Sequence, residues 1–113
     1  MEFDQAKVRE EIQEQLDSNP VLLYMKGTPQ FPQCGFSAQV VQALKQYDAP
    51  FAFVNILEHP EIRATIKEMQ NWPTFPQLYV NGELVGGCDI IMEMHQEGEL
   101  QDILATAGSE NNA

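Results

Sequence analysis

Positive charge is scarce in this 113-residue sequence, which has six Lys and Arg residues against 17 Asp and Glu and a net charge of −11. Residues 68–113 contain eight acidic residues and no Lys or Arg. A nucleic-acid-binding protein normally presents a basic face to the phosphates, and anionic membrane surfaces attract basic segments in the same way. We therefore expect neither nucleic acid nor a membrane among the partners.

Long apolar runs and a leader segment are missing as well. The longest uninterrupted apolar run covers residues 21–25, whereas a membrane-spanning helix needs about 20 residues. The amino terminus, Met1-Glu2-Phe3-Asp4, is acidic and lacks the basic flank and apolar segment of a signal peptide. These features predict a cytoplasmic protein.

Cysteine is also scarce, and two residues of this type cannot build a disulfide framework. In a chain without a leader, such a pair more often indicates reactivity, metal binding or simple burial. The length predicts one domain over residues 1–107, and the polar composition of residues 108–113 predicts a flexible C-terminal tail.

The hydropathy pattern alternates between helical and extended segments. Apolar residues recur at helical spacing on one side of residues 4–18, and again from Phe36 to Tyr47. Asn81-Gly82 between two apolar runs indicates a hairpin, and Asp89 is suited to cap a helix. The predicted helices cover 4–18, 34–47, 60–70, 89–96 and 100–104, and the predicted strands cover 21–25, 51–56, 77–80 and 83–86.

The order of these segments predicts the fold class. A strand–helix–strand unit favours a right-handed crossover with parallel pairing, and the hairpin adds two antiparallel strands. We therefore predict an α/β fold with a four-stranded mixed sheet and helices on both faces.

Cys34 is the first candidate functional residue, because it stands where a proline-rich loop turns into a predicted helix. The unpaired N–H groups and the dipole of a helix start favour a thiolate, and Lys26 can add a positive charge. A buried, inert cysteine is the alternative, and position alone leaves both interpretations open.

Ser37 distinguishes this cysteine from a dithiol redox site. Cys34-Gly35-Phe36-Ser37 has serine where a C-x-x-C motif has its second thiol. An intramotif disulfide is therefore impossible, and Cys34 must take a second thiol from elsewhere.

Four motifs in order resemble the monothiol glutaredoxins of the Cys-Gly-Phe-Ser class. The similarity runs from about residue 4 to residue 104, and the seven residues between Lys26 and Cys34 also fit the monothiol class. The resemblance implies a thioredoxin-like (glutaredoxin) fold. The motifs are Tyr24-Met25-Lys26-Gly27-Thr28-Pro29, Cys34-Gly35-Phe36-Ser37, Trp72-Pro73-Thr74-Phe75-Pro76-Gln77 and Gly86-Gly87-Cys88-Asp89.

The resemblance implies a glutathione site beside the catalytic thiol of Cys34. Phe75-Pro76 matches the family's cis-proline step, where the backbone of Phe75 pairs with the cysteinyl part of glutathione. The N–H groups of Cys88 and Asp89 suit the γ-glutamyl carboxylate, and the Asp89 carboxylate suits its ammonium group. The implied glutathione-binding residues are Lys26 and Arg63 (for the glycyl carboxylate), Phe75, Cys88 and Asp89.

Cys88 and the residues around the motifs also have plainer interpretations. The Cys88 thiol can form a disulfide with Cys34, contact a cluster, or contribute only its backbone, which we favour. Trp72 is expected mainly to pack. His59 and His95 lack metal-ligand spacing with Cys34 and are expected to be structural.

Counting ligands leads to the implied function. A 2Fe–2S cluster needs four donors, and two chains with two glutathiones would supply four thiolates, Cys34 being the metal ligand from each chain. The resemblance thus implies a homodimer that carries a labile cluster to apo iron–sulfur acceptor proteins, and a BolA-like partner. The alternatives are a glutathione-dependent thiol–disulfide oxidoreductase (protein deglutathionylation) acting through Cys34 and, ranked lowest, a Cys34–Cys88 redox sensor.

Overall fold

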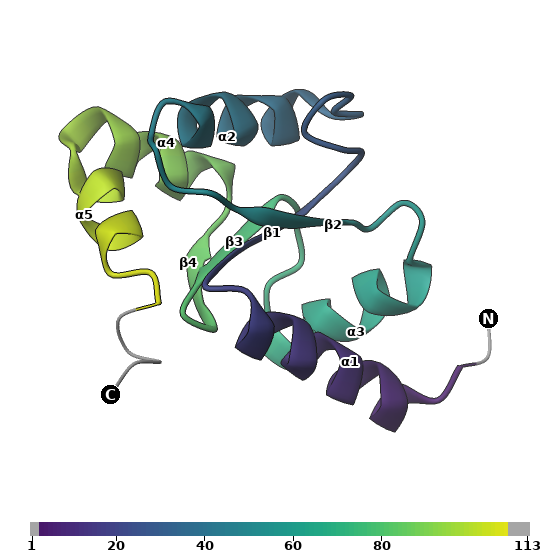
Figure 1. The fold of residues 1–113 in the computed structure, drawn as a ribbon. Helices are drawn as coiled ribbons and strands as arrows, with labels where there is room; N and C mark the ends of the chain where they lie inside the picture. Colours follow the sequence, from purple (N-terminus) through teal and green to yellow (C-terminus); the bar gives the residue numbers. More distant parts are fainter. Residues whose placement is uncertain (1–2, 109–113) are drawn as a thin grey trace.

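The computed structural model describes residues 3–108, and the order of its elements is the predicted one (Figure 1). The predicted tail over 108–113 lies outside the described residues except for Gly108, so the domain boundary at residue 107 stays a prediction. The elements are α1 (Gln5–Ser18), β1 (Val21–Met25), α2 (Gly35–Lys45), β2 (Ala52–Asn55), α3 (Pro60–Gln70), β3 (Gln77–Val80), β4 (Glu83–Gly86), α4 (Cys88–Glu97) and α5 (Glu99–Ala105).

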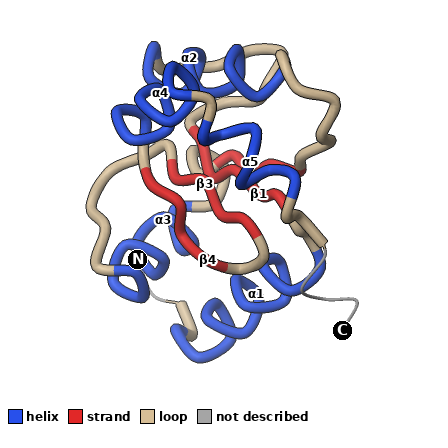
Figure 2. Tube along the Cα trace, turned by 90° about the vertical axis from the view of Figure 1, so that its left-hand side faces the viewer, coloured by secondary structure: helices blue, strands red, loops and turns tan. Residues whose placement is uncertain are grey.

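The four strands form one mixed sheet, as predicted, and their order, which the sequence did not fix, is β2-β1-β3-β4. Figure 2 shows β1, β3 and β4 side by side. β1 and β2 are parallel because α2 carries the chain back between them, whereas β3 is antiparallel to both β1 and β4. The hairpin between β3 and β4 turns at Asn81 and Gly82, which have φ angles of 52° and 79°. Asn and Gly tolerate these left-handed conformations, which explains why this dipeptide makes the turn.

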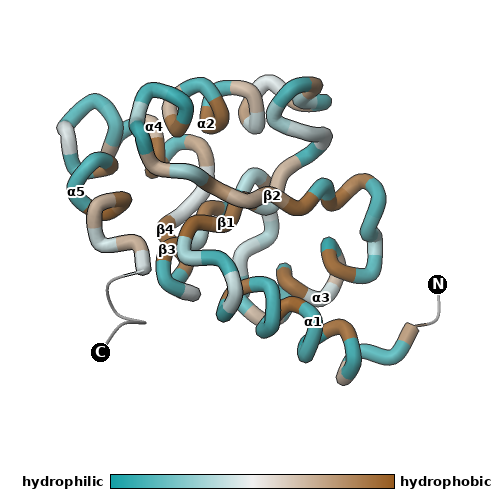
Figure 3. The backbone as a smooth tube through the Cα atoms, viewed as in Figure 1, coloured by the Kyte–Doolittle hydropathy of each residue, from teal (hydrophilic) through white to brown (hydrophobic). Residues whose placement is uncertain are grey.

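Helices cover both faces of the sheet, with α1 and α3 on one side and α2, α4 and α5 on the other (Figure 1). Strand β1 supplies both cores by alternation: Leu23 and Met25 pack with α2 and α4, whereas Leu22 and Tyr24 pack with α1 and α3. Figure 3 shows the apolar residues of the helices concentrated toward the sheet. β1 is buried along its whole length, which makes its carboxyl end a rigid base for the loop that leads to Cys34.

Four details differ from the prediction. Helix α4 begins at Cys88 with Gly87 as its N-cap, so Asp89 lies in the first turn rather than at the cap. The side chain of Phe36 is 58% exposed, although its spacing assigns it to the apolar face of α2. β2 is two residues shorter than predicted, and α2 covers Gly35–Lys45 rather than 34–47.

Helices long and apolar enough to cross a membrane are absent from the part of the chain that the structure describes.

Candidate functional site

Cys34 is the N-cap residue of α2, at the junction that the sequence predicted. Its backbone is extended, with φ −152° and ψ 136°, and its carbonyl accepts the first helical hydrogen bond from the Ala38 N–H at 3.0 Å. The preceding loop is closed by the Gln33 N–H, which donates to the Lys26 carbonyl at 2.9 Å. The loop and the helix together hold the partly exposed thiol at the end of β1.

The surroundings of Cys34 favour its thiolate. The backbone N–H of Ser37 lowers the pKa of Cys34 most, and the Phe36 N–H, the Lys26 charge and the Ser37 hydroxyl act in the same direction. Burial opposes them, but the net pKa lies below the ordinary value of a cysteine. The structure thus favours the reactive interpretation of Cys34 over the inert one.

Ser37 ties the start of α2 to the end of β1. Its side chain is fully buried, and its Oγ accepts a hydrogen bond from the Lys26 N–H at 3.2 Å. The residue that replaces the second thiol therefore has a structural contact of its own and also faces the Cys34 sulfur. This pairing brings Lys26 and Cys34 to one place, as the prediction requires.

The loop opposite Cys34 contains a cis peptide bond between Phe75 and Pro76, as the resemblance implied. Gln77, which follows it, is fully buried, and its Nε2 donates to the carbonyls of Trp72 and Thr74, each at 3.0 Å. Its Oε1 accepts from the Tyr79 hydroxyl at 2.8 Å. One buried amide therefore fixes the course of the whole loop, because it pairs groups that burial would otherwise leave unsatisfied.

Two glycines let the chain pass close to this loop before α4 begins. Gly86 has φ 153°, and a Cβ at this position would lie 2.9 Å from the Ile90 side chain. A Cβ on Gly87 would lie 3.3 Å from the Pro76 carbonyl oxygen and 3.5 Å from Nε1 of Trp72. The close approach brings the first turn of α4, with its N–H groups free of helical partners, beside the cis-proline loop.

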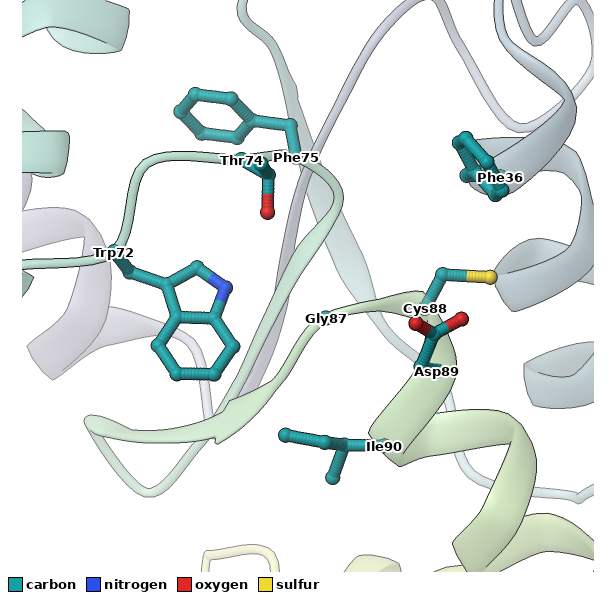
Figure 4. A pocket seen from close by; sticks show the side chains of 8 residues that line it. All are labelled: Phe36, Trp72, Thr74, Phe75, Gly87, Cys88, Asp89 and Ile90. Carbon is teal, nitrogen blue, oxygen red and sulfur yellow. The ribbon is translucent and has the colours of Figure 1, made fainter.

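A pocket of about 340 Å³ lies between the loop and the two helix starts (Figure 4). Figure 4 shows the loop residues Trp72, Thr74 and Phe75 on one side and Cys88 and Asp89, in the first turn of α4, on the other. The lining residues are Phe36, Trp72, Thr74, Phe75, Gly87, Cys88, Asp89 and Ile90.

The structure brings together most, but not all, of the predicted site residues. Phe75, Cys88 and Asp89 line the pocket, and Cys34 precedes Phe36 at its edge. Arg63 lies on α3, partly exposed, and within residues 3–108 it is not among the residues that line this pocket. Its predicted contact with a glycyl carboxylate stays a prediction.

Cys88 differs from Cys34 in its chemistry. Burial raises the pKa of its thiol, and the negative charges of Asp89 and Cys34 raise it further. Its Sγ donates a hydrogen bond to Oε1 of Gln39 on α2 at 3.5 Å. The Cys88 thiol is therefore held in its protonated form.

Four residues of the site were missed or assigned to packing by sequence reasoning. Trp72 was expected mainly to pack and Phe36 only to belong to the apolar face of a helix, yet both line the pocket, and Nε1 of Trp72 is buried without a partner among the described residues. Gln39 and Gln77 were missed because their contacts depend on the tertiary fold. A polar residue at the start of a buried strand was the one available signal for Gln77.

A metal site within a single chain is not formed by the described residues, which contain no group of three or more His, Cys, Asp and Glu side chains suited to one ion. The two histidines have local partners: His95 Nδ1 lies 2.6 Å from the Tyr47 hydroxyl, and His59 Nδ1 lies 3.5 Å from a Glu61 oxygen.

Comparison with known proteins agrees with this geometry. The family model described as Glutaredoxin matches residues 21–85. A curated protein named Glutaredoxin 4, from Pasteurella multocida, is 60% identical over 85% of this chain and 88% of its own length. The solution structure of reduced poplar apo GrxS14 is 51% identical, with a TM-score of 0.78 over 88% of this chain and 92% of that one.

A more distant structure, a buckwheat glutaredoxin–glutathione complex, has a TM-score of 0.81 over 92% of this chain and 93% of that one. At 24% identity it shows the fold alone. The family model covers more than half of the residues, and Cys34-Gly35-Phe36-Ser37 supplies the single-thiol motif. This chain therefore belongs to the glutaredoxin family, in its monothiol Cys-Gly-Phe-Ser class.

Proposed function

We propose that this monothiol glutaredoxin binds glutathione and carries a 2Fe–2S cluster between two copies of the chain, for storage and transfer. The observation that carries the proposal is the single activated thiol of Cys34 beside a pocket. Ser37 occupies the second-thiol position and is buried, and Cys88 is protonated and hydrogen-bonded. One chain thus offers one thiolate, while a 2Fe–2S cluster requires four donors.

The pocket suits glutathione as the source of the remaining thiolates. The first-turn N–H groups of α4, at Cys88 and Asp89, are suited to the γ-glutamyl carboxylate, since helix starts bind anions. The Asp89 carboxylate lines the same pocket and suits the ammonium group. Phe75 lines the pocket, and its backbone would pair with the cysteinyl part. Lys26 and Arg63, which do not line the pocket, would attract the glycyl carboxylate.

The surface around Cys34 is suited to contact with a second chain. Phe31 and Phe36, which flank Cys34, are 75% and 58% exposed. Residues 18–47 contain no Asp or Glu, although the chain as a whole has 17. Two chains with net charge −11 would repel each other less across this segment than elsewhere, and a contact there would bring both Cys34 thiolates to one cluster.

The implied partners belong to the same proposal. We propose that apo iron–sulfur acceptor proteins receive the cluster, that a BolA-like protein can replace one chain of the homodimer, and that the protein acts in the cytoplasm. Half of the cluster's ligands would be glutathione molecules, which exchange readily. Such exchange suits a protein that must release its cluster.

Deglutathionylation is the second candidate, favoured by the lowered pKa and partial exposure of the Cys34 thiol. In that reaction the Cys34 thiolate attacks the glutathione sulfur of a mixed disulfide and releases the protein thiolate. A second glutathione thiolate then attacks the Cys34-bound glutathione, which yields oxidised glutathione and the free Cys34 thiolate. The same pocket would serve both functions.

Anaerobic reconstitution with iron, sulfide and glutathione tests the main proposal. We expect a coloured dimer with two glutathiones, measured by visible absorption, molar mass and thiol analysis. Cys34→Ser is expected to remain a colourless monomer, while Cys88→Ser, its matched control, keeps the cluster. A colourless wild-type monomer, combined with rapid glutathione-dependent turnover of a glutathionylated protein, would establish the enzyme instead.

A further inference from the structure

The thiol of Cys88 is near the reactive thiol of Cys34 but is held toward a different element. Cys34 is the N-cap of α2, two residues before Phe36, and Phe36 and Cys88 line the same pocket. We propose that Gln39 is a positioning residue that holds the Cys88 thiol against α2 and so keeps it from forming a disulfide with Cys34. The inference concerns the cluster-free protein and does not depend on the proposed function.

The geometry of the contact supports this role. Gln39 lies on α2, one turn after Cys34, and its Oε1 accepts the Cys88 Sγ–H at 3.5 Å. Figure 4 shows the Cys88 sulfur pointing toward the α2 side and away from Trp72 and Thr74. The remainder of the Cys88 side chain packs against the core that α2 and α4 help to form, and this packing also holds the side chain in place.

The chemistry of the hydrogen bond favours the unreactive form of Cys88. An amide carbonyl can only accept, so its contact with Sγ requires that Cys88 keep its proton. Thiol–disulfide exchange requires a thiolate that is free to approach the sulfur under attack. The Gln39 amide therefore opposes both the ionisation and the movement that Cys88 needs.

The reaction that Gln39 restrains can be written in full. The Cys34 thiolate attacks oxidised glutathione, forms a Cys34–glutathione mixed disulfide and releases one glutathione thiolate. Cys88, after losing its proton to that thiolate, attacks the Cys34 sulfur and releases the second glutathione. The net result is one Cys34–Cys88 disulfide and two reduced glutathione molecules, with two electrons passing from the cysteines to oxidised glutathione.

A matched pair of glutamines on α2 makes the test specific. Gln39 and Gln42 are both exposed, but of the two only Gln39 accepts a hydrogen bond from Cys88. Reduced, cluster-free protein is mixed with oxidised glutathione, and mass spectrometry follows the mixed disulfide and its conversion to the Cys34–Cys88 disulfide. We expect Gln39→Leu to accelerate the conversion roughly 2- to 10-fold, the effect of losing one hydrogen bond, and Gln42→Leu to match wild type.

A second readout separates positioning from a general loosening of the protein. In a Cys34→Ser background, alkylation of Cys88 by iodoacetamide is expected to quicken with Gln39→Leu and to return to the original rate, or below it, with Gln39→Glu, which keeps an acceptor oxygen. Equal rates for wild type and Gln39→Leu would overturn the proposal. Equal acceleration by Gln39→Leu and Gln42→Leu would also overturn it.

Discussion

Two cysteines lie at the starts of two neighbouring helices, yet their thiol pKa values depart from that of an ordinary cysteine in opposite directions. Cys34 at the start of α2 has a lowered pKa, whereas Cys88 at the start of α4 has a raised one. Both thiols are subject to the dipole of a helix, so the dipole alone does not decide. N–H donors and Lys26 surround Cys34, while burial and Asp89 disfavour the Cys88 thiolate, and these local groups determine which thiol reacts.

The largest expected effect comes from replacing Gln77. This variant tests whether the pocket can be lost while the pKa difference between the Cys34 and Cys88 thiols remains. Gln77→Leu leaves the carbonyls of Trp72 and Thr74 and the Tyr79 hydroxyl without their partner. We expect the free energy of unfolding to fall by about 1–3 kcal/mol and glutathione to bind much more weakly. Urea denaturation and calorimetric titration with glutathione measure the two effects.

In the same variant, Cys34 is expected to keep its faster alkylation relative to Cys88, because α2 and α4 do not depend on Gln77. A loss of that difference would mean that the cis-proline loop, rather than the helix starts, distinguishes the thiols. The exposed Gln13 on α1, changed to Leu, serves as a control for the loss of a glutamine.

Asp89→Asn is expected to reduce the pKa difference between the two thiols by lowering the pKa of Cys88. Removing the negative charge lowers the pKa of Cys88 toward its ordinary value, although burial, the largest cause, still holds it above that value. In a Cys34→Ser background, Cys88 should therefore be alkylated faster at neutral pH. Glutathione affinity should fall as well, since its ammonium group loses a charged partner.

Glu93→Gln, one turn farther along α4, removes the same charge outside the pocket and is the control for Asp89→Asn. If both substitutions speed alkylation equally, the net charge of the acidic chain rather than Asp89 sets the reactivity of Cys88.

Ser37→Ala is expected to reduce the pKa difference between the two thiols by raising the pKa of Cys34. This is the smallest of the expected effects. The variant loses the Ser37 hydroxyl, the last of the groups that lower the pKa of Cys34, but keeps the backbone N–H donors. The pKa should rise, so the thiolate fraction at pH 7 should fall by less than the roughly tenfold change of one pKa unit. The rate of Cys34 alkylation at pH 7 measures this, and an unchanged rate would mean that the backbone N–H groups and Lys26, without the hydroxyl, lower the pKa of Cys34.

Much of the fold was predictable because its signals are local. The apolar run of β1, the Asn81-Gly82 turn and the proline at the start of α3 each act within a few residues, and each element formed where it was predicted. The position of Cys34 followed from the same kind of signal. The N-cap of α4 lies two residues earlier than expected, because Gly87, which has no capping side chain, takes the position predicted for Asp89.

The rest of the site depends on contacts between distant segments. Gln39 meets Cys88 across 49 residues of sequence, and the helical pattern alone cannot tell that Phe36 is left exposed beside the pocket. The pocket itself arises where α2, the cis-proline loop and α4 converge, so its shape follows from the sheet topology rather than from any one motif.

The central claim is that Cys34 is reactive and Cys88 is restrained beside a common pocket. A pH titration of both thiols in the wild-type, cluster-free protein tests this claim most directly. Mass-resolved alkylation at a series of pH values gives a separate pKa for Cys34 and Cys88. We expect the midpoint for Cys34 below, and that for Cys88 above, the ordinary cysteine value of about 8.5. Coincident midpoints, or the reverse order, would contradict the account.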